Sequence, residues 1–297
     1  MTSPSKRRAH VVGLGLIGSS VALALSESGW AVTGTDRDPL IVETALEEGV
    51  IAGVDLDDDV DLVVIATPAG VVADTANDIL SHSSKSTLIV TDVAGVKSAI
   101  VGDVADPRFL AGHPMAGSEL RGLAGARPDL FRECTWVLTP TSATKPETYT
   151  ALHGVLRELG ANVVAVDADD HDRLVAVASH VPHLLAGALM NEASRVAEQD
   201  AVLLQLAAGG FRDMTRVAAG HPGIWPDICA LKVMHAPTPA MIHSRTAPAI
   251  RPSARRRRPG SGDPDAQMIA KAPAQARTRT RSWPTQTVIA AASRCGA

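Results

Sequence analysis

The stretch His10-Val-Val-Gly-Leu-Gly-Leu-Ile-Gly18 places three glycines in the order Gly-x-Gly-x-x-Gly after a short apolar segment. We expect a strand over 10–14, a helix over 16–28 and a second strand over 31–35. A strand, a glycine-rich turn and a helix in this order begin the βαβ unit of a dinucleotide-binding domain. The pattern therefore predicts an α/β fold with a nucleotide cofactor.

Each glycine has its own physical task. Gly13 allows the tight turn from strand to helix, Gly15 lets a pyrophosphate approach the backbone, and Gly18 allows the helix to pack closely on the strand. Asp36 ends the second strand, where its carboxylate can accept hydrogen bonds from both ribose hydroxyls and would repel a 2′-phosphate. This favours NAD over NADP, although the neighbouring Arg37 suits the extra phosphate. The predicted cofactor-binding residues are Gly13, Gly15, Leu16, Ile17, Gly18, Asp36, Thr67 and Asp92.

An alternative interpretation of the same region is an export signal, because Lys6-Arg7-Arg8 precedes the apolar run over 11–25. The glycine pattern inside that run is not needed by an export signal, so we favour the strand and helix.

The chain has three cysteines, an odd number at wide spacing, which argues against a disulfide framework and a thiolate zinc site. We therefore expect a cytoplasmic protein without a membrane segment.

Buried parallel strands alternate with helices through the first half of the chain. All-apolar runs over 61–67 and 87–92 flank a helical stretch over 70–81, which is typical of a doubly wound parallel sheet. Further strands are expected over 109–112, 135–139 and 162–166, with a helix over 146–159. We assign 10–167 to a Rossmann-type domain of this class, preceded by a flexible segment over 1–9.

The chain changes character twice after residue 167. An alanine- and leucine-rich pattern predicts helices over 168–198, with a kink at Pro182, and over 201–219. We assign 168–230 to an all-helical substrate and dimerisation domain that would close one side of a cleft. Residues 231–297 hold twelve of the 28 basic residues, eight of the 19 prolines and no apolar period, so we expect a disordered basic tail. Its Arg255–Arg258 run could contact nucleic acid, but without interleaved aromatic residues a solvated tail is favoured.

Polar residues gather where strands are expected to end and along the helical domain. The segment 91–97 follows one strand, and 112–119 follows the next. Loops at the carboxyl ends of parallel strands face the ligand crevice, so His113 is a candidate general base for a substrate hydroxyl. A loop histidine that caps a backbone group is the competing interpretation. The helical domain adds three groups: His171-Asp172, Ser179-His-Val-Pro-His183 and Phe211-Arg-Asp-Met-Thr-Arg216.

In order and spacing, these motifs resemble the prephenate dehydrogenase family over about residues 10–230. The resemblance implies NAD-dependent oxidative decarboxylation of prephenate to 4-hydroxyphenylpyruvate in tyrosine biosynthesis, by an oxidoreductase acting on a CH–CH group. It implies that His113 and His183 are catalytic, with His113 bonded to the C4 hydroxyl. It also implies that Arg216 grips a substrate carboxylate, that Glu119 and Asp213 line the cleft, and that Trp225 lies near the arginine. A homodimer is implied for a complete helical domain.

Each of these residues also has a purely structural interpretation. His180 and His183 could be packed core histidines, or could form a metal site with His113, but no HExxH-type pattern or cysteine pair supports a metal. Asp213 and Arg216 could form a salt bridge on a solvated helix face. Trp225 could be a core residue, and Lys97 a surface lysine at a helix start.

The chain departs from the family pattern in two places. Ala94-Gly95 stands where the family usually has Gly-Ser, so a hydroxyl that would assist the histidine is missing. The resemblance also ends near Ala230, where the basic, proline-rich segment begins. We expect this segment to be the product of a frameshift, which the other two reading frames of the gene would test.

Three other functions compete with prephenate oxidation. Arogenate dehydrogenase performs the same chemistry on a substrate with an amino acid side chain, and the motifs do not separate the two. A 3-hydroxyacid dehydrogenase would need a lysine on the helical domain, and 168–230 contains none. The third is a catalytically impaired NAD-binding product with a disrupted C-terminus.

Overall fold

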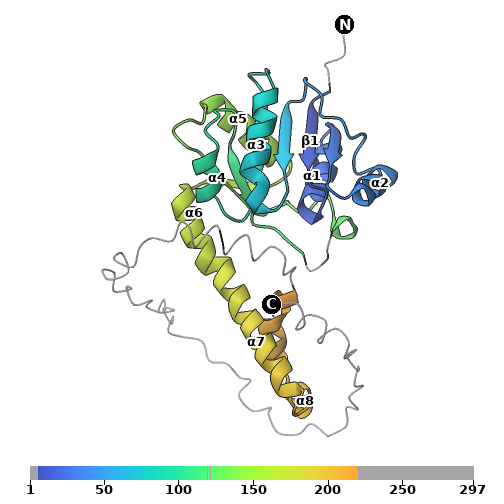
Figure 1. Cartoon of the computed structure of the whole chain (residues 1–297), viewed down its shortest axis with the longest axis vertical. Helices are drawn as coiled ribbons and strands as arrows, with labels where there is room; N and C mark the ends of the chain where they lie inside the picture. The colour runs from blue at the N-terminus through green and yellow to red at the C-terminus, as the bar shows by residue number, and fades with distance from the viewer. Residues whose placement is uncertain (1–5, 119, 121, 220–229, 231–297) are drawn as a thin grey trace, which may run out of the picture. The chain divides into compact units, whose positions relative to one another are not determined.

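The computed structural model describes residues 6–118, 120, 122–219 and 230. Strands and helices alternate through its first part (Figure 1). The elements of this part are β1 (Arg8–Val12), α1 (Leu16–Glu27), β2 (Ala31–Thr35), α2 (Pro39–Glu47), β3 (Leu62–Ile65), η1 (Ala69–Val71), α3 (Val72–His82), β4 (Ile89–Asp92), α4 (Ser98–Asp103), β5 (Ala111–Pro114), η2 (Leu123–Gly125), β6 (Thr135–Thr139), α5 (Pro146–Glu158) and β7 (Asn162–Ala165).

The strands form two hydrogen-bonded groups, β2-β1-β3-β4 and β5-β6-β7. All pairs in the first group are parallel, as the alternation of apolar strands and helices predicts. An isolated parallel bridge between Val90 and Phe109 joins β4 to the chain entering β5, so β4 and β5 run in the same direction. β5 then pairs antiparallel with β6, which the apolar pattern did not reveal. The doubly wound α/β class is confirmed, with one reversed strand pair.

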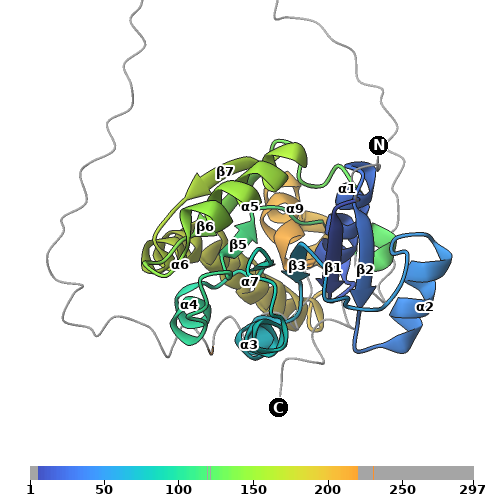
Figure 2. The same cartoon turned by 90° about the horizontal axis from the view of Figure 1, so that it is seen from above.

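Helices cover both faces of the first sheet, and β3 shows why. Its four side chains are all buried, and alternate ones point to opposite faces. Leu62 and Val64 belong to a core shared with α1 and α5, whereas Val63 and Ile65 belong to a second core shared with α3 and α4. Figure 2 shows α1 and α5 on one side of the strands and α3 and α4 on the other. An unbroken apolar strand is stable only in such a doubly covered sheet.

The start of α2 shows that local sequence sets an element boundary. The Asp38 side chain accepts a hydrogen bond from the Leu40 N–H at 3.0 Å, and Pro39 occupies the first helical turn. Gly49 follows the helix with φ of +70°, the left-handed conformation that ends many helices. The cap, the proline start and the glycine end of α2 therefore all come from residues within or next to the helix.

The second part of the described chain is helical. It contains α6 (Ala168–Val175), η3 (Ala176–His180), α7 (Val181–Ala197), α8 (Val202–Leu206), α9 (Gly209–Arg216) and η4 (Val217–Ala219). The first three form one continuous rod, and α9 and η4 pack against α7 (Figure 1). Pro182 lacks the N–H that would bond back one turn, and the preceding η3 is a π-helical turn. The irregularity predicted at Pro182 is therefore a widened turn.

Candidate active site

The glycine loop between β1 and α1 has three different environments. Gly13 has a φ of +94°, and a Cβ there would lie 2.7 Å from the Ala66 carbonyl oxygen. A Cβ on Gly18 would collide with the Gly13 carbonyl oxygen, whereas a Cβ on Gly15 would meet no atom within 4 Å. The turn at Gly13, the open approach at Gly15 and the close packing at Gly18 therefore agree with the tasks predicted from the sequence.

The surroundings of the loop fit a dinucleotide. Asp36, at the end of β2, accepts the Leu14 N–H at 2.7 Å, so its carboxylate lies beside the loop. Helix α1 has Gly15 as its N-cap and no side-chain cap, which leaves the N–H groups at Leu16 and Ile17 for a phosphate. Within the described residues, the buried Thr67 hydroxyl has no hydrogen-bond partner. Contact of these residues with a cofactor stays a prediction.

A buried ion pair joins the ends of β4 and β5. The Lys97 ammonium bonds Asp92, and both side chains are fully buried. It also donates to the Gly112 carbonyl at 2.8 Å, while the Gly112 N–H donates to Asp92 at 3.2 Å. The Ala94 N–H is a further donor to Asp92 at 2.9 Å. Asp92 therefore fastens the segment just before His113; its predicted cofactor contact remains untested. Lys97 is not on the surface.

His113 lies in β5 and is bonded to a second histidine from the helical part. Its Nδ1 is 2.9 Å from Nε2 of His171, which is 2% exposed. Nδ1 of His171 lies 2.8 Å from Oδ1 of Asp172. That carboxylate also accepts the backbone N–H groups of Lys97 at 2.9 Å and Ser98 at 3.1 Å, at the start of α4. Three side chains thus form a hydrogen-bonded row from β5 to α6.

Burial and charge set the protonation of this row. Burial lowers the pKa of His113 well below 6.5, and the Lys97 charge lowers it further, against an opposing contribution from Asp172. Burial works to raise the pKa of Asp172, but the hydrogen bonds from His171, Lys97 and Ser98 outweigh it and bring that pKa to about 2. At neutral pH the row therefore begins with a carboxylate and ends with a neutral imidazole.

The other predicted site residues lie on the helical part or outside the described residues. His183, on α7, has its Nδ1 3.2 Å from the Ser179 carbonyl oxygen. Asp213 and Arg216 are both exposed on α9, and Arg216 is the last residue of that helix. The approach of these three residues to His113 stays a prediction. Glu119 and Trp225 lie outside the described residues, as does 231–297 with its predicted disorder and Arg255–Arg258 run.

Sequence reasoning singled out His171-Asp172 but gave the pair no task, and it treated Lys97 as a surface residue. A histidine followed by aspartate has no recognisable spacing to His113, which is 58 residues away. The one usable signal was for Lys97, since a lysine five residues after a strand-end aspartate can fold back onto it. The sequence does not show that the loop between Asp92 and Lys97 is tight enough for this contact.

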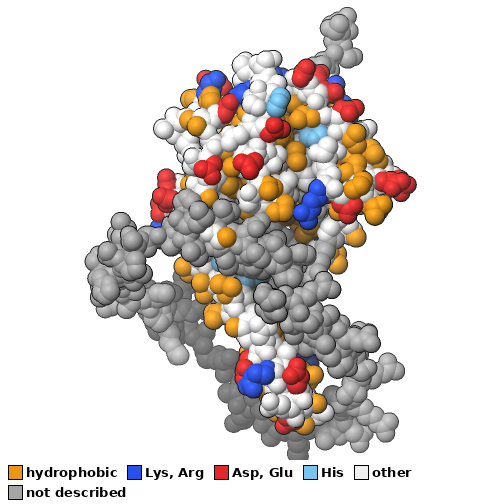
Figure 3. All heavy atoms as spheres, viewed as in Figure 1, with side chains coloured by type: hydrophobic (Ala, Val, Ile, Leu, Met, Phe, Trp, Pro, Cys, Tyr) orange, Lys and Arg blue, Asp and Glu red, His pale blue; other side chains and the backbone are white. Residues whose placement is uncertain are grey.

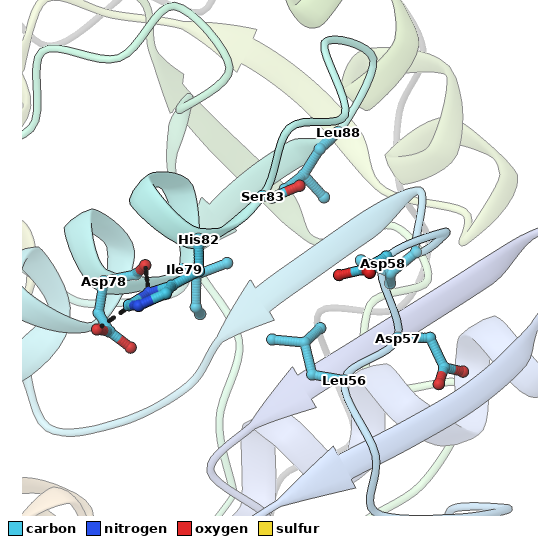
Figure 4. Close-up of a pocket in the computed structure, with 9 residues that line it drawn as sticks. Leu56, Asp57, Asp58, Asp78, Ile79, His82, Ser83 and Leu88 are labelled. Atoms are coloured by element: carbon cyan, nitrogen blue, oxygen red, sulfur yellow. Dashed lines mark hydrogen bonds and ion pairs between the residues drawn. The ribbon is translucent and has the colours of Figure 1, made fainter.

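A separate hollow of about 150 Å³ lies at the other ends of the strands. Its walls come from the segments that precede β3 and β4 and from the end of α3 (Figure 4). Asp57, Asp58 and Asp78 line it, and His82 Nδ1 lies 2.8 Å from the Asp78 carbonyl oxygen. These carboxylates would repel a dinucleotide phosphate, so this hollow is not the cofactor site.

Two family models match the chain. "Prephenate dehydrogenase, nucleotide-binding domain" matches residues 21–165, and "Prephenate dehydrogenase, dimerization domain" matches residues 167–234. Prephenate dehydrogenase from Bacillus subtilis is 34% identical over 236 residues, which are 73% of this chain and 62% of the relative. The chain thus spans less than two thirds of the length of that relative.

Two solved structures are similar over most of the described fold. Prephenate dehydrogenase from A. aeolicus, in complex with hydroxyphenyl propionate and NAD+, is 30% identical with a TM-score of 0.71, covering 79% of this chain and 87% of that one. Arogenate dehydrogenase from Synechocystis is 33% identical with a TM-score of 0.61, covering 76% and 86%. Together with both domain matches and the ordered motifs, these similarities show that the chain belongs to the prephenate dehydrogenase family.

Proposed function

We propose that this protein is an NAD-dependent dehydrogenase that converts prephenate to 4-hydroxyphenylpyruvate and carbon dioxide. The observation that carries the proposal is His113, a partly exposed imidazole at the strand ends whose pKa is held well below 6.5. A neutral imidazole accepts a proton from a substrate hydroxyl, which is the base this reaction needs. The match to two family models named for prephenate dehydrogenase supports prephenate as the substrate we propose.

Each residue of the proposed site has a separate role in the reaction. NAD+, when bound, supplies the acceptor for the hydride that leaves C4 of the substrate ring. His113 takes the C4 hydroxyl proton as the hydride departs, and returns it to the phenolate oxygen after the ring carboxylate has left as carbon dioxide. Arg216 would hold a substrate carboxylate through its planar fork of donors. His183, Asp213, Glu119 and Trp225 complete the proposed substrate site.

The direct test is production of NADH from prephenate by the purified protein, followed by its absorbance. Arogenate must be tested in parallel, because a structure named arogenate dehydrogenase is 33% identical to this chain. Turnover of arogenate alone would replace the proposed substrate by its amino acid counterpart. Binding of NAD+ without turnover of either compound would contradict the proposal and favour a catalytically impaired protein.

Gly15→Ala provides a test of cofactor binding that is separate from folding. The φ of Gly15 is −74°, and a Cβ would meet no protein atom within 4 Å, so the variant should fold normally. The methyl group would occupy the space through which a pyrophosphate reaches the backbone. We expect affinity for NAD+, measured by calorimetry, to fall by about tenfold or more, which corresponds to about 1.4 kcal/mol. Unchanged affinity would place the pyrophosphate elsewhere.

We infer that the helical part also pairs with a second copy of the chain. Within the described residues, Ala168–Ala197 is long and apolar enough by composition to cross a membrane, with 17% of its most apolar window buried. Its amino-terminal end, however, is tied to β5 and α4 through His171 and Asp172. Figure 3 shows hydrophobic side chains on the surface of the molecule. The exposed apolar side chains of the helical part are Leu174, Val177, Val181, Leu184, Leu185, Val202, Leu204, Leu206 and Met214.

Nine exposed apolar side chains lie between Leu174 and Met214. Exposed apolar patches of soluble proteins often mark association sites. The match to a dimerization domain identifies the partner we propose as an identical chain. The proposed dimer works in the cytoplasm, where the partly buried Cys134 stays a free thiol.

Replacing Leu184 and Leu185 together by glutamate should convert the dimer to a monomer, because two charges would have to be buried in the interface. Leu40→Glu is the matched control, since Leu40 is 69% exposed on α2, far along the chain from this surface. Light scattering coupled to size exclusion would report both masses. The inference fails if the wild-type protein has the mass of a single chain, or if the double variant keeps the wild-type mass.

A further inference from the structure

Three side chains in a row lead from the start of α4 to His113, and the proposed reaction uses only the last of them. We propose that His171 and Asp172 are positioning residues that fix the tautomer of His113 and leave its Nε2 unprotonated to receive the substrate proton. This inference rests on the proposed function for its kinetic consequence. The protonation of Nε2 of His113, which is its structural claim, can be measured without any substrate.

The direction of the hydrogen bonds follows from Asp172. An ionised carboxylate only accepts, and the pKa of this one is about 2. Its oxygens accept the backbone N–H groups of Lys97 and Ser98, which hold it in place across 75 and 74 residues of chain. The third bond, at 2.8 Å, joins Oδ1 to Nδ1 of His171. His171 must therefore carry its proton on Nδ1.

The same logic carries over to His113. In the proposed arrangement the single ring proton of His171 lies on Nδ1, so its Nε2 has a lone pair and accepts. The atom 2.9 Å away is Nδ1 of His113, which must then be the donor. A neutral His113 that is protonated on Nδ1 has a bare Nε2. Imidazole in water favours the opposite tautomer, with its proton on Nε2, and that form could not act as a base at this nitrogen.

The charges around His113 agree with this arrangement. Burial and the Lys97 charge disfavour its protonated form, whereas the Asp172 charge favours it. The base is therefore neutral before reaction, and Asp172 supplies the opposing charge when the proton arrives. The ring planes of His113 and His171 are 71° apart with centroids at 5.1 Å, an edge contact in which a ring N–H can donate to the other ring's nitrogen.

Two substitutions of His171 separate its hydrogen bond from its bulk. His171→Leu fills the space but offers no acceptor, whereas the amide of His171→Gln reaches about as far as Nε2 and its oxygen can accept from His113. We expect His171→Leu to lower kcat with prephenate by about 10–100-fold, with KM within about twofold of wild type, because the base is lost but substrate contacts remain. His171→Gln should recover most of kcat.

His10→Leu is the control for disturbance of a buried histidine. His10 is 1% exposed, and its ring bonds the Thr33 hydroxyl at 2.8 Å in a different part of the sheet. It should lose thermal stability without a selective loss of kcat when assayed below its transition. A kcat loss in His10→Leu equal to that in His171→Leu would show that general disturbance explains the effect, and would overturn the inference.

Nitrogen-15 spectra of histidine-labelled protein provide the readout that is independent of activity. In the wild type at neutral pH, the resonance assigned to His113 by its loss in His113→Asn should show a protonated Nδ1 and a bare Nε2. His171→Leu should shift His113 toward the Nε2-protonated form, and His171→Gln should not. A wild-type His113 protonated on Nε2 would overturn the inference even if prephenate is oxidised. The expected tautomers without prephenate turnover would instead count against the proposed function alone.

Discussion

Replacing His113 by asparagine should lower kcat for prephenate oxidation by about 10²–10⁴-fold, the usual contribution of a positioned general base. The asparagine amide nitrogen lies about where Nδ1 lies in histidine, so it can still donate to Nε2 of His171 and keep that contact. It has no atom in the place of Nε2. Affinity for NAD+ and the thermal midpoint should therefore stay close to the wild-type values, and the loss should be confined to the chemical step.

The pH dependence of the wild type gives a second check on His113. A base works in its neutral form, and burial together with the Lys97 charge lowers the pKa of His113 below 6.5. A lower pKa keeps the base deprotonated in more acidic solution, so kcat/KM should begin to fall only below pH 6.5. An acidic limb above that value, or His113→Asn with activity within about tenfold of wild type, would assign the proton to a different group.

Lys97→Met should cause the largest loss of stability among single substitutions at the site. It leaves the fully buried carboxylate of Asp92 without its counter-charge. Removing one partner of a buried ion pair costs about 3–5 kcal/mol, because the remaining charge has no solvent. For a fold of this size the thermal midpoint should fall by roughly 6–20 °C, measured by calorimetry.

Lys85→Met is the matched control for that experiment. Lys85 also pairs with an aspartate, Asp61, at 2.7 Å, but the Asp61 side chain is 42% exposed. Exposed pairs contribute about 1 kcal/mol or less, so this variant should lose little. In Lys97→Met combined with Asp92→Asn, the buried charge is gone and part of the lost stability should return. Equal losses in Lys97→Met and Lys85→Met would show that burial of the first pair does not matter.

Local patterns were sufficient to predict the parallel strands β1 to β4 of the nucleotide-binding part. Three features depend only on neighbours within a few residues: the glycine spacing, the all-apolar β3 and the Asp38-Pro39 start of α2. Each of these local sequences favours a single backbone conformation. The strand over 135–139 was predicted with its observed bounds for the same reason. Family resemblance, not local physics, supplied the roles of His183, Arg216 and their neighbours.

Contacts between distant segments could not be predicted from the sequence. The direction of β5 relative to β6 depends on the path of the chain between them. That segment has no regular spacing of apolar residues from which its path could be predicted. The burial of Lys97 depends on Asp92 and on the Gly112 carbonyl, 15 residues away, and a lone lysine ordinarily indicates the surface. The His113–His171 bond depends on where α6 begins after seven strands have been placed.

The backbone N–H groups at the amino-terminal end of α4 are bonded by Asp172, which is distant in the sequence. One family model ends at residue 165 and the other begins at residue 167, so α4 and Asp172 lie in different models. The halves of this chain are therefore not interchangeable modules. A chimera that joins the first half to a foreign second half would inherit the glycine loop intact, yet its base would take whatever tautomer the new neighbour imposes. We therefore expect substitutions at positions 171 and 172 to change the behaviour of His113, although these residues lie in the part of the chain that matches the other family model.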